Sequence, residues 1–315
     1  VRINHRLHGL KQMNTLLQDI RFGLRMLLKS PSVSIVATIA LALGIGANTA
    51  IFTLVNAVML KSLPVQKPEE LVLFTDTTSE GTSVEDTPRT GLWTRFSYAS
   101  YEYFRDHNQS FADLAAFRSG ESPLSVRRAD AGGAAAARAQ GHLVTGNYFS
   151  LLSVHALRGR VLTPEDDKPN AEPAAVISHL YWQKQLNSDP TVIGKNFIIN
   201  GTSFTVVGVT PQEFFGARVR RPPDFWLPLS FFPQGELRES FLKNNQVYFL
   251  TLMGRLKPGV SIDQAQNAVN LQLRQFLTDQ AGNQLTEERK QGIQNTYVKV
   301  VEGAGGLSGL RRIYS

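Results

Sequence analysis

The residues best suited to chemistry are the three consecutive acids of Thr163-Pro-Glu-Asp-Asp167. Clustered carboxylates can bind a cation or act as general acid and base. No histidine or second acidic cluster stands close by in the sequence to complete such a site. Threonine, then proline, then acids is also typical of a helix start, where the acids face the positive end of the helix dipole. We therefore predict a capped helix start here.

Two glycine-containing stretches are similar to nucleotide-binding loops, but neither has the full pattern. Ile193-Gly-Lys195 could end a phosphate loop, yet such a loop needs glycine five residues before Gly194, where Asp189 stands. The glycines of 303–309 follow a predicted strand, but Ser308 occupies the last glycine position of a dinucleotide fingerprint. We expect no nucleotide-binding site in this chain.

Other catalytic patterns are not found. The sequence contains no cysteine, which excludes disulfides, thiol catalysis and Cys-based metal sites. It has neither the HExxH pair of zinc proteases nor the GxSxG elbow of hydrolases. We predict that the chain is not an enzyme and holds neither metal nor cofactor. The scattered histidines are at positions 5, 8, 107, 142, 155 and 179.

The feature that organises the chain is an apolar stretch near its N-terminus. The 31 residues from Ser30 to Leu60 include no charged side chain, and Lys29 and Lys61 bracket them. A helix needs about 20 apolar residues to cross a bilayer. We therefore predict one transmembrane helix over residues 30–61. The alternative, a cleaved signal peptide, would have an apolar region of only about 7–15 residues.

The positive charge lies before this stretch. Residues 1–29 carry six Lys or Arg against one Asp, which accounts for +5 of the net +7 and leaves +2 for the other 286 residues. A basic flank predicts a cytoplasmic N-terminus and an extracytoplasmic main domain, in a bacterial inner membrane. Residues 14–29 have the spacing of a basic amphipathic helix beside anionic lipid. The remaining charge of +2 gives no support for a nucleic-acid partner.

Within the predicted span, Ala42, Gly46 and Ala50 recur at intervals of four residues. Such a small-residue face lets two helix backbones approach closely in lipid. We interpret these three residues as a helix-packing face. The alternative is that Ala and Gly are simply common in membrane helices.

The rest of the sequence predicts an α+β domain. Asn200-Gly201 between two β-branched and aromatic runs indicates a tight hairpin. Pro228 suggests that the strand 225–229 lies at a sheet edge, and residues 97–117 are predicted to be mainly helical with a break at 108–110. The other expected elements are strands 71–74, 174–178, 247–256 and 296–301, hairpin 123–140, and helices 180–186 and 262–278.

A series of short motifs resembles a known family. Together the motifs resemble the periplasmic core domain of MacB-like ABC transporter permeases. The stretches Asp19–Pro31 and Ala40–Phe52 resemble the first helix of the same group, most of all in the acidobacterial duplicated orphan permeases. The motifs of the core domain are Gly146–Phe149, Arg158–Arg160, Thr163–Asp167, Asp189–Lys195, Asn200–Val209 and Phe214–Gly216.

The resemblance implies a two-lobed extracytoplasmic domain over residues 62–302. One lobe is porter-like, and a second lobe is inserted at about 165–230. It also implies a separate cytoplasmic ABC ATPase, a homo- or pseudo-dimer of permeases, and a periplasmic adaptor or outer-membrane partner. Three further membrane helices should follow the domain, so residues 303–315 are predicted to be a linker toward the second of the permease's membrane helices.

Two functions follow from this reading. The first is the N-terminal part of an ABC-type export permease, which transmits ATPase-driven motion across the membrane to the extracytoplasmic domain. The second is a membrane-tethered binding or regulatory module without transport activity. A stop after Ser315 or a cell-wall hydrolase as partner would favour the second.

Overall fold

The computed structural model describes residues 29, 31–55, 62–75, 91–120, 122–130, 132, 135–218, 222–231, 242 and 244–307. The chain divides into two compact units, Val1–Lys61 and Ser62–Ser315. The predicted amphipathic segment 14–29 lies outside the described residues except for Lys29.

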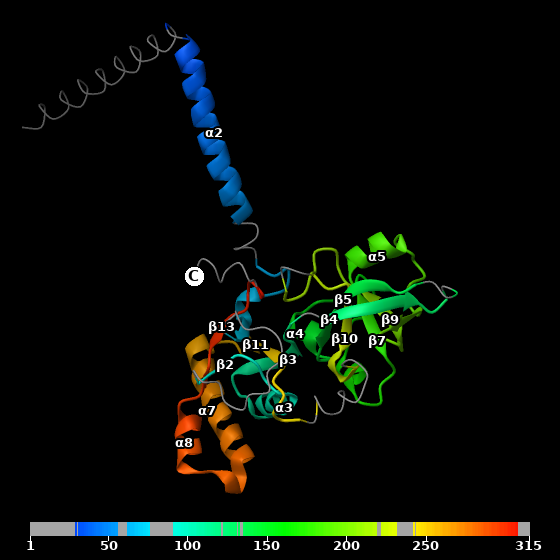
Figure 1. The fold of residues 1–315 in the computed structure, drawn as a ribbon, viewed down its shortest axis with the longest axis vertical. Coiled ribbons are helices and arrows are strands. Elements are labelled where there is room, and N and C mark those ends of the chain that lie inside the picture. The colour runs from blue at the N-terminus through cyan, green and yellow to red at the C-terminus, as the bar shows by residue number, and fades with distance from the viewer. Residues whose placement is uncertain are drawn as a thin grey trace, which may run out of the picture. The chain divides into compact units, whose positions relative to one another are not determined.

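The described part of the first unit is mainly helix α2 (Pro31–Val55), shown in blue in Figure 1. Its 25 residues include no Asp, Glu, Lys or Arg. Within the described residues, no helix is both long and apolar enough to be identified as a membrane span. The predicted span 30–61 extends past both ends of α2 and stays a prediction. The large apolar side chains of α2 that are more than half exposed are Ile35, Val36, Ile39, Leu41, Leu43, Ile45 and Phe52.

The second unit begins and ends in a region that we call the helix–sheet lobe. Its antiparallel sheet has the order β3-β11-β1-β13, and α3 and α7 pack beside each other against it (Figure 1). The strands are β1 (Leu71–Phe74), β3 (Phe111–Arg118), β11 (Leu250–Leu256) and β13 (Val300–Glu302). The helices are α3 (Tyr98–His107), α7 (Ile262–Ala281) and α8 (Glu287–Gln294), and a small parallel pair joins β2 (Leu92–Trp93) to β12 (Tyr297–Val298).

The prediction of a helix over 97–117 is wrong in its second half. Helix α3 ends at His107, because the Asn108 side chain donates to the Arg105 carbonyl at 3.1 Å and accepts from the Phe111 N–H at 2.8 Å. Residues 111–118 then form β3, between β11 and β5. Their alanines favour a helix in isolation, but pairing with a neighbouring strand on each side overrides this preference.

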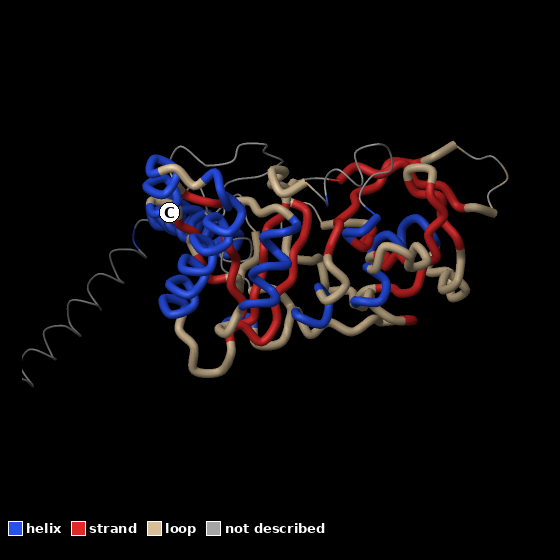
Figure 2. Tube along the Cα trace, turned by 90° about the horizontal axis from the view of Figure 1, so that it is seen from below, coloured by secondary structure: helices blue, strands red, loops and turns tan. Residues whose placement is uncertain are grey.

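The middle of the second unit forms a closed circle of strands, the strand ring. Its order is β10-β7-β9-β8-β4-β5, and β5 pairs back with β10. Figure 2 shows these strands curving around a shared interior. The strands are β4 (Ser122–Arg128), β5 (Ala137–Val144), β7 (Ala174–Ile177), β8 (Asn196–Ile199), β9 (Thr202–Val209) and β10 (Phe225–Pro228), with β6 (Arg158–Gly159) paired to β9. Short helices α4 (Tyr148–Leu151), α5 (His179–Leu186), η3 (Pro164–Asp167) and η4 (Leu229–Phe231) connect them.

Two local predictions in this ring have different outcomes. The Asn200-Gly201 hairpin is confirmed, with φ of +49° and +89° at the two turn residues, as a type I′ turn requires. The edge position of 225–229 is wrong, because β10 pairs with β5 on one side and β7 on the other. At the end of the strand, Pro228 is paired with β5 alone, because the pairing with β7 covers only Phe225 and Trp226.

The ring and the helix–sheet lobe share a sheet and a buried cluster. Phe117 of β3 pairs with Val144 of β5. Leu73 and Met253 from the sheet belong to the same buried cluster as Trp226 from the ring. The α+β prediction is therefore confirmed for the second unit. The strand ring includes β4 and β5, which precede residue 165, so the ring and the predicted inserted lobe do not have the same limits. The limits 165–230 of that lobe stay a prediction.

Candidate functional site at the two ends of the domain

The acidic motif 163–167 forms the capped helix start that the sequence predicts. The Thr163 N–H and hydroxyl donate to Asp166 Oδ2 at 2.8 and 2.9 Å, and Arg160 donates to both carboxylate oxygens of Asp166. Burial alone would raise the pKa of Asp166, but the hydrogen bonds from Arg160 and Thr163 hold it below its usual value. These contacts give the Asp166 carboxylate a structural role in capping the turn.

Asp167 ties this motif to two other segments. Its carboxylate accepts from the Ser230 N–H at 2.7 Å and the Gly146 N–H at 3.2 Å. Burial raises the pKa of Asp167 to about 6 in spite of these donors. A Cβ at Gly146 would lie 2.3 Å from the Thr163 carbonyl oxygen, so only glycine fits there. The motif at 146–149 and the motif at 163–167, which are separate in sequence, are thus in direct contact.

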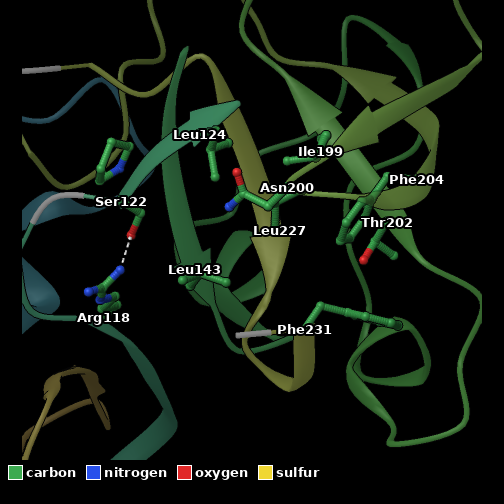
Figure 3. A pocket seen from close by; sticks show the side chains of 11 residues that line it. Arg118, Ser122, Leu124, Leu143, Ile199, Asn200, Thr202, Phe204, Leu227 and Phe231 are labelled. Atoms are coloured by element: carbon green, nitrogen blue, oxygen red, sulfur yellow. Dashed lines mark hydrogen bonds between the residues drawn. The ribbon is translucent and has the colours of Figure 1, made fainter. Parts of the chain in front are cut away.

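Two cavities lie among the described residues of the second unit. One, about 30 Å³ in volume, lies inside the strand ring, where Figure 3 shows Leu124, Leu143 and Leu227 on its wall and Arg118 donating to Ser122. That volume admits only a few water molecules. A second, of about 310 Å³, lies along α7 and α8 beside Leu277 and is near the lower limit for small-molecule sites.

The clearest functional geometry lies where the chain enters and leaves the second unit. We call residues 62–70 the incoming segment and residues 300–307 the outgoing segment. Strands β1 and β13 pair antiparallel in the register Val72 with Glu302. The Leu63 N–H donates to the Ala304 carbonyl at 2.7 Å, and the Gly303 N–H to the Leu71 carbonyl at 2.7 Å. The two segments therefore lie side by side and are directly bonded.

Arg255 of β11 fastens the incoming segment to the body of the domain. Its side chain is 12% exposed and lies 3.1 Å from Glu70. It donates to the carbonyls of Gln66, Lys67 and Leu151 at 3.0, 3.1 and 2.9 Å. The Lys67 ammonium, and then the Arg255 guanidinium, hold the pKa of the Glu70 carboxyl below its usual value. One guanidinium thus joins the incoming segment, β11 and helix α4.

The outgoing segment is fastened to the strand-ring region. The Leu307 N–H donates to the Ala217 carbonyl at 2.7 Å, and the Ala217 N–H donates to the Tyr148 hydroxyl at 2.9 Å. Gly306 has a φ of +63°, and a Cβ there would lie 2.5 Å from the Ala217 oxygen. Its lack of a side chain is what allows this close approach.

Helix α7 holds the same C-terminal strands through side-chain amides. Asn270 donates to the Val298 carbonyl at 3.3 Å and accepts from the Val298 N–H at 2.6 Å. Gln266 accepts from the Val300 N–H at 3.1 Å. The amides satisfy backbone groups of two short strands and couple α7 to the outgoing segment.

A comparison with protein families identifies the chain. The family model described as the MacB-like periplasmic core domain matches residues 34–271, well over half of the chain. The chain belongs to this family. MacB-like core domains are extracytoplasmic parts of ABC-type permeases, which work with a cytoplasmic ATPase. The domain is thus a transporter component. No curated protein matches the sequence.

Solved structures of low sequence identity accompany this match. A domain of a permease protein from Porphyromonas gingivalis has 13% identity and a TM-score of 0.47, covering 79% of this chain and 98% of its own. The periplasmic region of MacB from Actinobacillus actinomycetemcomitans has 13% identity and a TM-score of 0.47, covering 74% of this chain and 88% of its own. The extracellular domain of the noncanonic ABC-type transporter YknZ from Gram-positive bacteria has 14% identity and a TM-score of 0.45, covering 73% of this chain and 99% of its own.

The junction residues of this MacB-like domain were not found by sequence reasoning. Ala42, Gly46 and Ala50, predicted to pack helices, lie exposed on α2, and their packing role stays a prediction. Arg255, Asn270 and the other residues that join the two ends are ordinary polar residues of a strand and a helix. Only their partners, far away in sequence, distinguish them, and no local motif carries that information.

Proposed function

We propose that this chain is the N-terminal part of an ABC-type export permease that passes ATPase-driven motion to its extracytoplasmic domain. The observation that carries the proposal is the direct hydrogen bonding between the incoming and outgoing segments. In such a permease the ends of the domain are its connections to the membrane helices. A displacement of either end would therefore act on both lobes through defined hydrogen bonds.

The proposal places a transmembrane helix over residues 30–61, with α2 as its described part. The absence of charge from Ser30 to Leu60 and the exposed apolar side chains of α2 support this placement. The basic segment 1–29 supports a cytoplasmic N-terminus in a bacterial inner membrane. We assign Ala42, Gly46 and Ala50 to packing against a second membrane helix or a second permease.

The two lobes then have different connections. The helix–sheet lobe, built from both ends of the unit, is the porter-like lobe and receives the motion at Arg255 and at Asn270. The inserted lobe, at about 165–230, contains β7, β8, β9 and β10 of the strand ring and receives the motion at Ala217 and through the shared buried cluster. Coupling through contiguous packed and hydrogen-bonded contacts is the physical requirement for such transmission. A periplasmic adaptor or outer-membrane component would bind the domain.

Crosslinking in intact cells tests the proposal. The affinity-tagged chain, together with whatever permease sequence follows it in its gene, is crosslinked and purified, and bound proteins are identified. The proposal predicts a cytoplasmic ABC ATPase among them. Capture of extracytoplasmic proteins alone, such as a cell-wall hydrolase, would instead support a tethered regulatory module.

A second measurement addresses coupling. Arg255→Gln removes the positive charge and most of the hydrogen-bond donors at the incoming segment. It should reduce the effect of the domain on the rate of ATP hydrolysis and leave ATPase capture intact. Arg274→Gln on the exposed side of α7 is the matched control. Equal hydrolysis in both variants would contradict transmission through this junction.

A further inference from the structure

One face of the strand ring has an unusual collection of exposed aliphatic side chains. Outside α2, the large hydrophobic residues that are exposed in the described chain are Leu157, Leu180, Ile193, Leu271 and Tyr297. The first three lie on neighbouring elements: the segment at β6, helix α5, and the loop 187–195. Single exposed apolar residues need no explanation, but a cluster is often a contact surface.

Several contacts bring these elements together. The Leu157 N–H donates to Val209 at 2.8 Å, and the next residue, Thr210, accepts from the His179 N–H at 3.3 Å. A Cβ at Gly159 would lie 3.1 Å from Ile193 Cδ1, so the Ile193 side chain covers this glycine. The three elements that carry these exposed aliphatic side chains are therefore neighbours in the domain.

Trp182 lies beneath this surface and fixes its geometry. The Arg158 guanidinium lies 5.3 Å from the Trp182 ring centre, and the indole N–H donates to the Asp189 carbonyl at 2.8 Å. The tryptophan itself is only 7% exposed. It thus joins β6, α5 and the loop into a firm support, on which Leu157, Leu180 and Ile193 protrude.

The three elements that bear these aliphatic side chains carry more exposed basic side chains than acidic ones. Arg158, Lys184 and Lys195 are all exposed on these elements. Asp189 lies on the same loop; its carboxylate accepts from the Thr191 N–H and hydroxyl and lies 4.0 Å from Arg128. Lys195 interacts electrostatically with Asp189 and with Asp130. The surface therefore combines protruding aliphatic groups with a border on which basic side chains outnumber acidic ones.

We propose that this surface, formed by Leu157, Arg158, Leu180, Lys184, Ile193 and Lys195, docks on an anionic lipid surface. The inference rests on the proposed function, because a membrane anchor near residue 61 keeps the domain at high local concentration beside lipid. Aliphatic insertion with cations at the headgroup level is the chemistry of interfacial binding. Protein interfaces are instead rich in exposed aromatic residues and poor in lysine, which does not fit this surface.

The absence of native cysteine allows a direct test on the full chain. Leu157→Cys and Leu180→Cys, each labelled with an environment-sensitive dye, are reconstituted in vesicles containing lipid-borne quenchers. The vesicles are phosphatidylcholine alone, or equal parts phosphatidylcholine and phosphatidylglycerol. Leu271→Cys on α7 is the matched control, since Leu271 is equally aliphatic and 70% exposed. Quenching at 157 and 180, but not 271, that requires the anionic lipid would support the proposal.

Charge neutralisation sharpens the result. Lys184→Gln in the labelled chains should reduce the ratio of docked to undocked domain about five-fold, as expected for one charge near an anionic surface. No quenching, equal quenching at 271, or a dye shift that depends on protein density rather than lipid charge would overturn the proposal. The last result would point to a second copy of the chain.

An alkaline wash separates this inference from the proposed function. A chain that resists extraction but shows no quenching keeps its membrane anchor and loses the docking surface. A chain that is washed out, yet was quenched beforehand by anionic lipid, keeps the docking surface and loses the anchor. Failure of both measurements overturns both proposals.

Discussion

Glu70 and Arg255 lie 185 residues apart in the sequence, and their side chains meet at 3.1 Å beside the point where the chain enters the domain. The same guanidinium donates to three backbone carbonyls, two in the incoming segment and one in α4. A weakly exposed arginine with this many partners holds its position better than a surface ion pair does. The contact makes β11 the anchor of the incoming segment.

Arg255→Met should therefore destabilise the domain by roughly 2–3 kcal/mol, because it removes charge-assisted hydrogen bonds and leaves carbonyls without donors. Urea unfolding followed by tryptophan fluorescence measures this, since Trp93, Trp182 and Trp226 all lie in the second unit. Arg274→Met is the control and should change the unfolding free energy by less than about 0.5 kcal/mol. Equal effects would show that the Arg255 contacts contribute little.

Asn270→Leu should loosen the C-terminal strands. The substitution removes both hydrogen bonds to Val298, whose backbone N–H is then left unpaired in a fully buried residue. We expect a loss of roughly 1–2 kcal/mol and faster amide hydrogen exchange over residues 297–302. Asn267→Leu, on the exposed side of α7, should leave that exchange unchanged. Unchanged exchange in Asn270→Leu as well would mean that other contacts hold the strands.

Local sequence signals predicted the parts of the fold that local chemistry determines. Asn200-Gly201 and the capping box at Thr163 need only nearby residues, and both are confirmed. The strand at residues 111–118 was predicted as helix, because its alanines show no strand preference and its two partner strands lie elsewhere in the sequence. Pro228 was predicted at an edge, because nothing local indicates that β10 closes a ring.

The junction could not be predicted for the same reason. Arg255 is one of many arginines in the sequence, and its partners at residues 66–70 and 151 are brought to it only by sheet pairing. Asp166, in contrast, belongs to an acidic motif whose spacing attracts attention, and it accepts hydrogen bonds from Thr163 within the same turn. The contacts that join the two ends of this domain are long-range, and a single sequence contains little trace of them.

Gly146→Ala and Gly292→Ala should have opposite effects. The new Cβ at 146 would lie 2.3 Å from the Thr163 oxygen and 2.6 Å from Pro164 Cα, so backbone must move and the loss should be at least about 2 kcal/mol. Nothing lies within 4 Å of a Cβ at Gly292, in helix α8, so alanine there should stabilise by about 0.5–1 kcal/mol. Thermal unfolding of both variants measures the difference. A neutral Gly146→Ala would contradict the close contact.

Asp167 should make the domain more stable in mild acid. Burial raises its pKa from 3.8 to about 6, so the folded chain holds this proton more tightly than the unfolded chain does. The resulting stabilisation is complete below pH 3.8 and is lost as the pH rises through about 6, with a total of roughly 3 kcal/mol. A carboxyl ¹³C titration of Asp167 should show a midpoint near 6. A midpoint near 4 would show that the donors from Ser230 and Gly146 outweigh burial.

His142 should act in the opposite direction. Its ring packs between Phe117 and Tyr148, at centroid distances of 5.0 and 5.6 Å, and neither ring nitrogen has a hydrogen-bond partner among the described residues. Burial, and then the charge of Arg218, lower the pKa of His142 well below 6.5. The neutral ring therefore gives its full stabilisation above pH 6.5. This stabilisation falls as the pH drops below 6.5, because the His142 ring binds a proton more weakly in the folded chain than in the unfolded chain.

His142→Phe should remove this acid sensitivity and raise stability at neutral pH by about 1 kcal/mol, since two unpaired buried polar atoms are replaced by apolar ones. Without His142, the effect of Asp167 is no longer opposed. Lowering the pH from 6 to 4 should therefore stabilise the variant more than it stabilises the parent chain. Urea unfolding at a series of pH values measures both slopes. His155→Phe, at an exposed position, serves as the control and should keep the parent profile. An unchanged profile in His142→Phe would show that the His142 ring can ionise in the folded domain without cost.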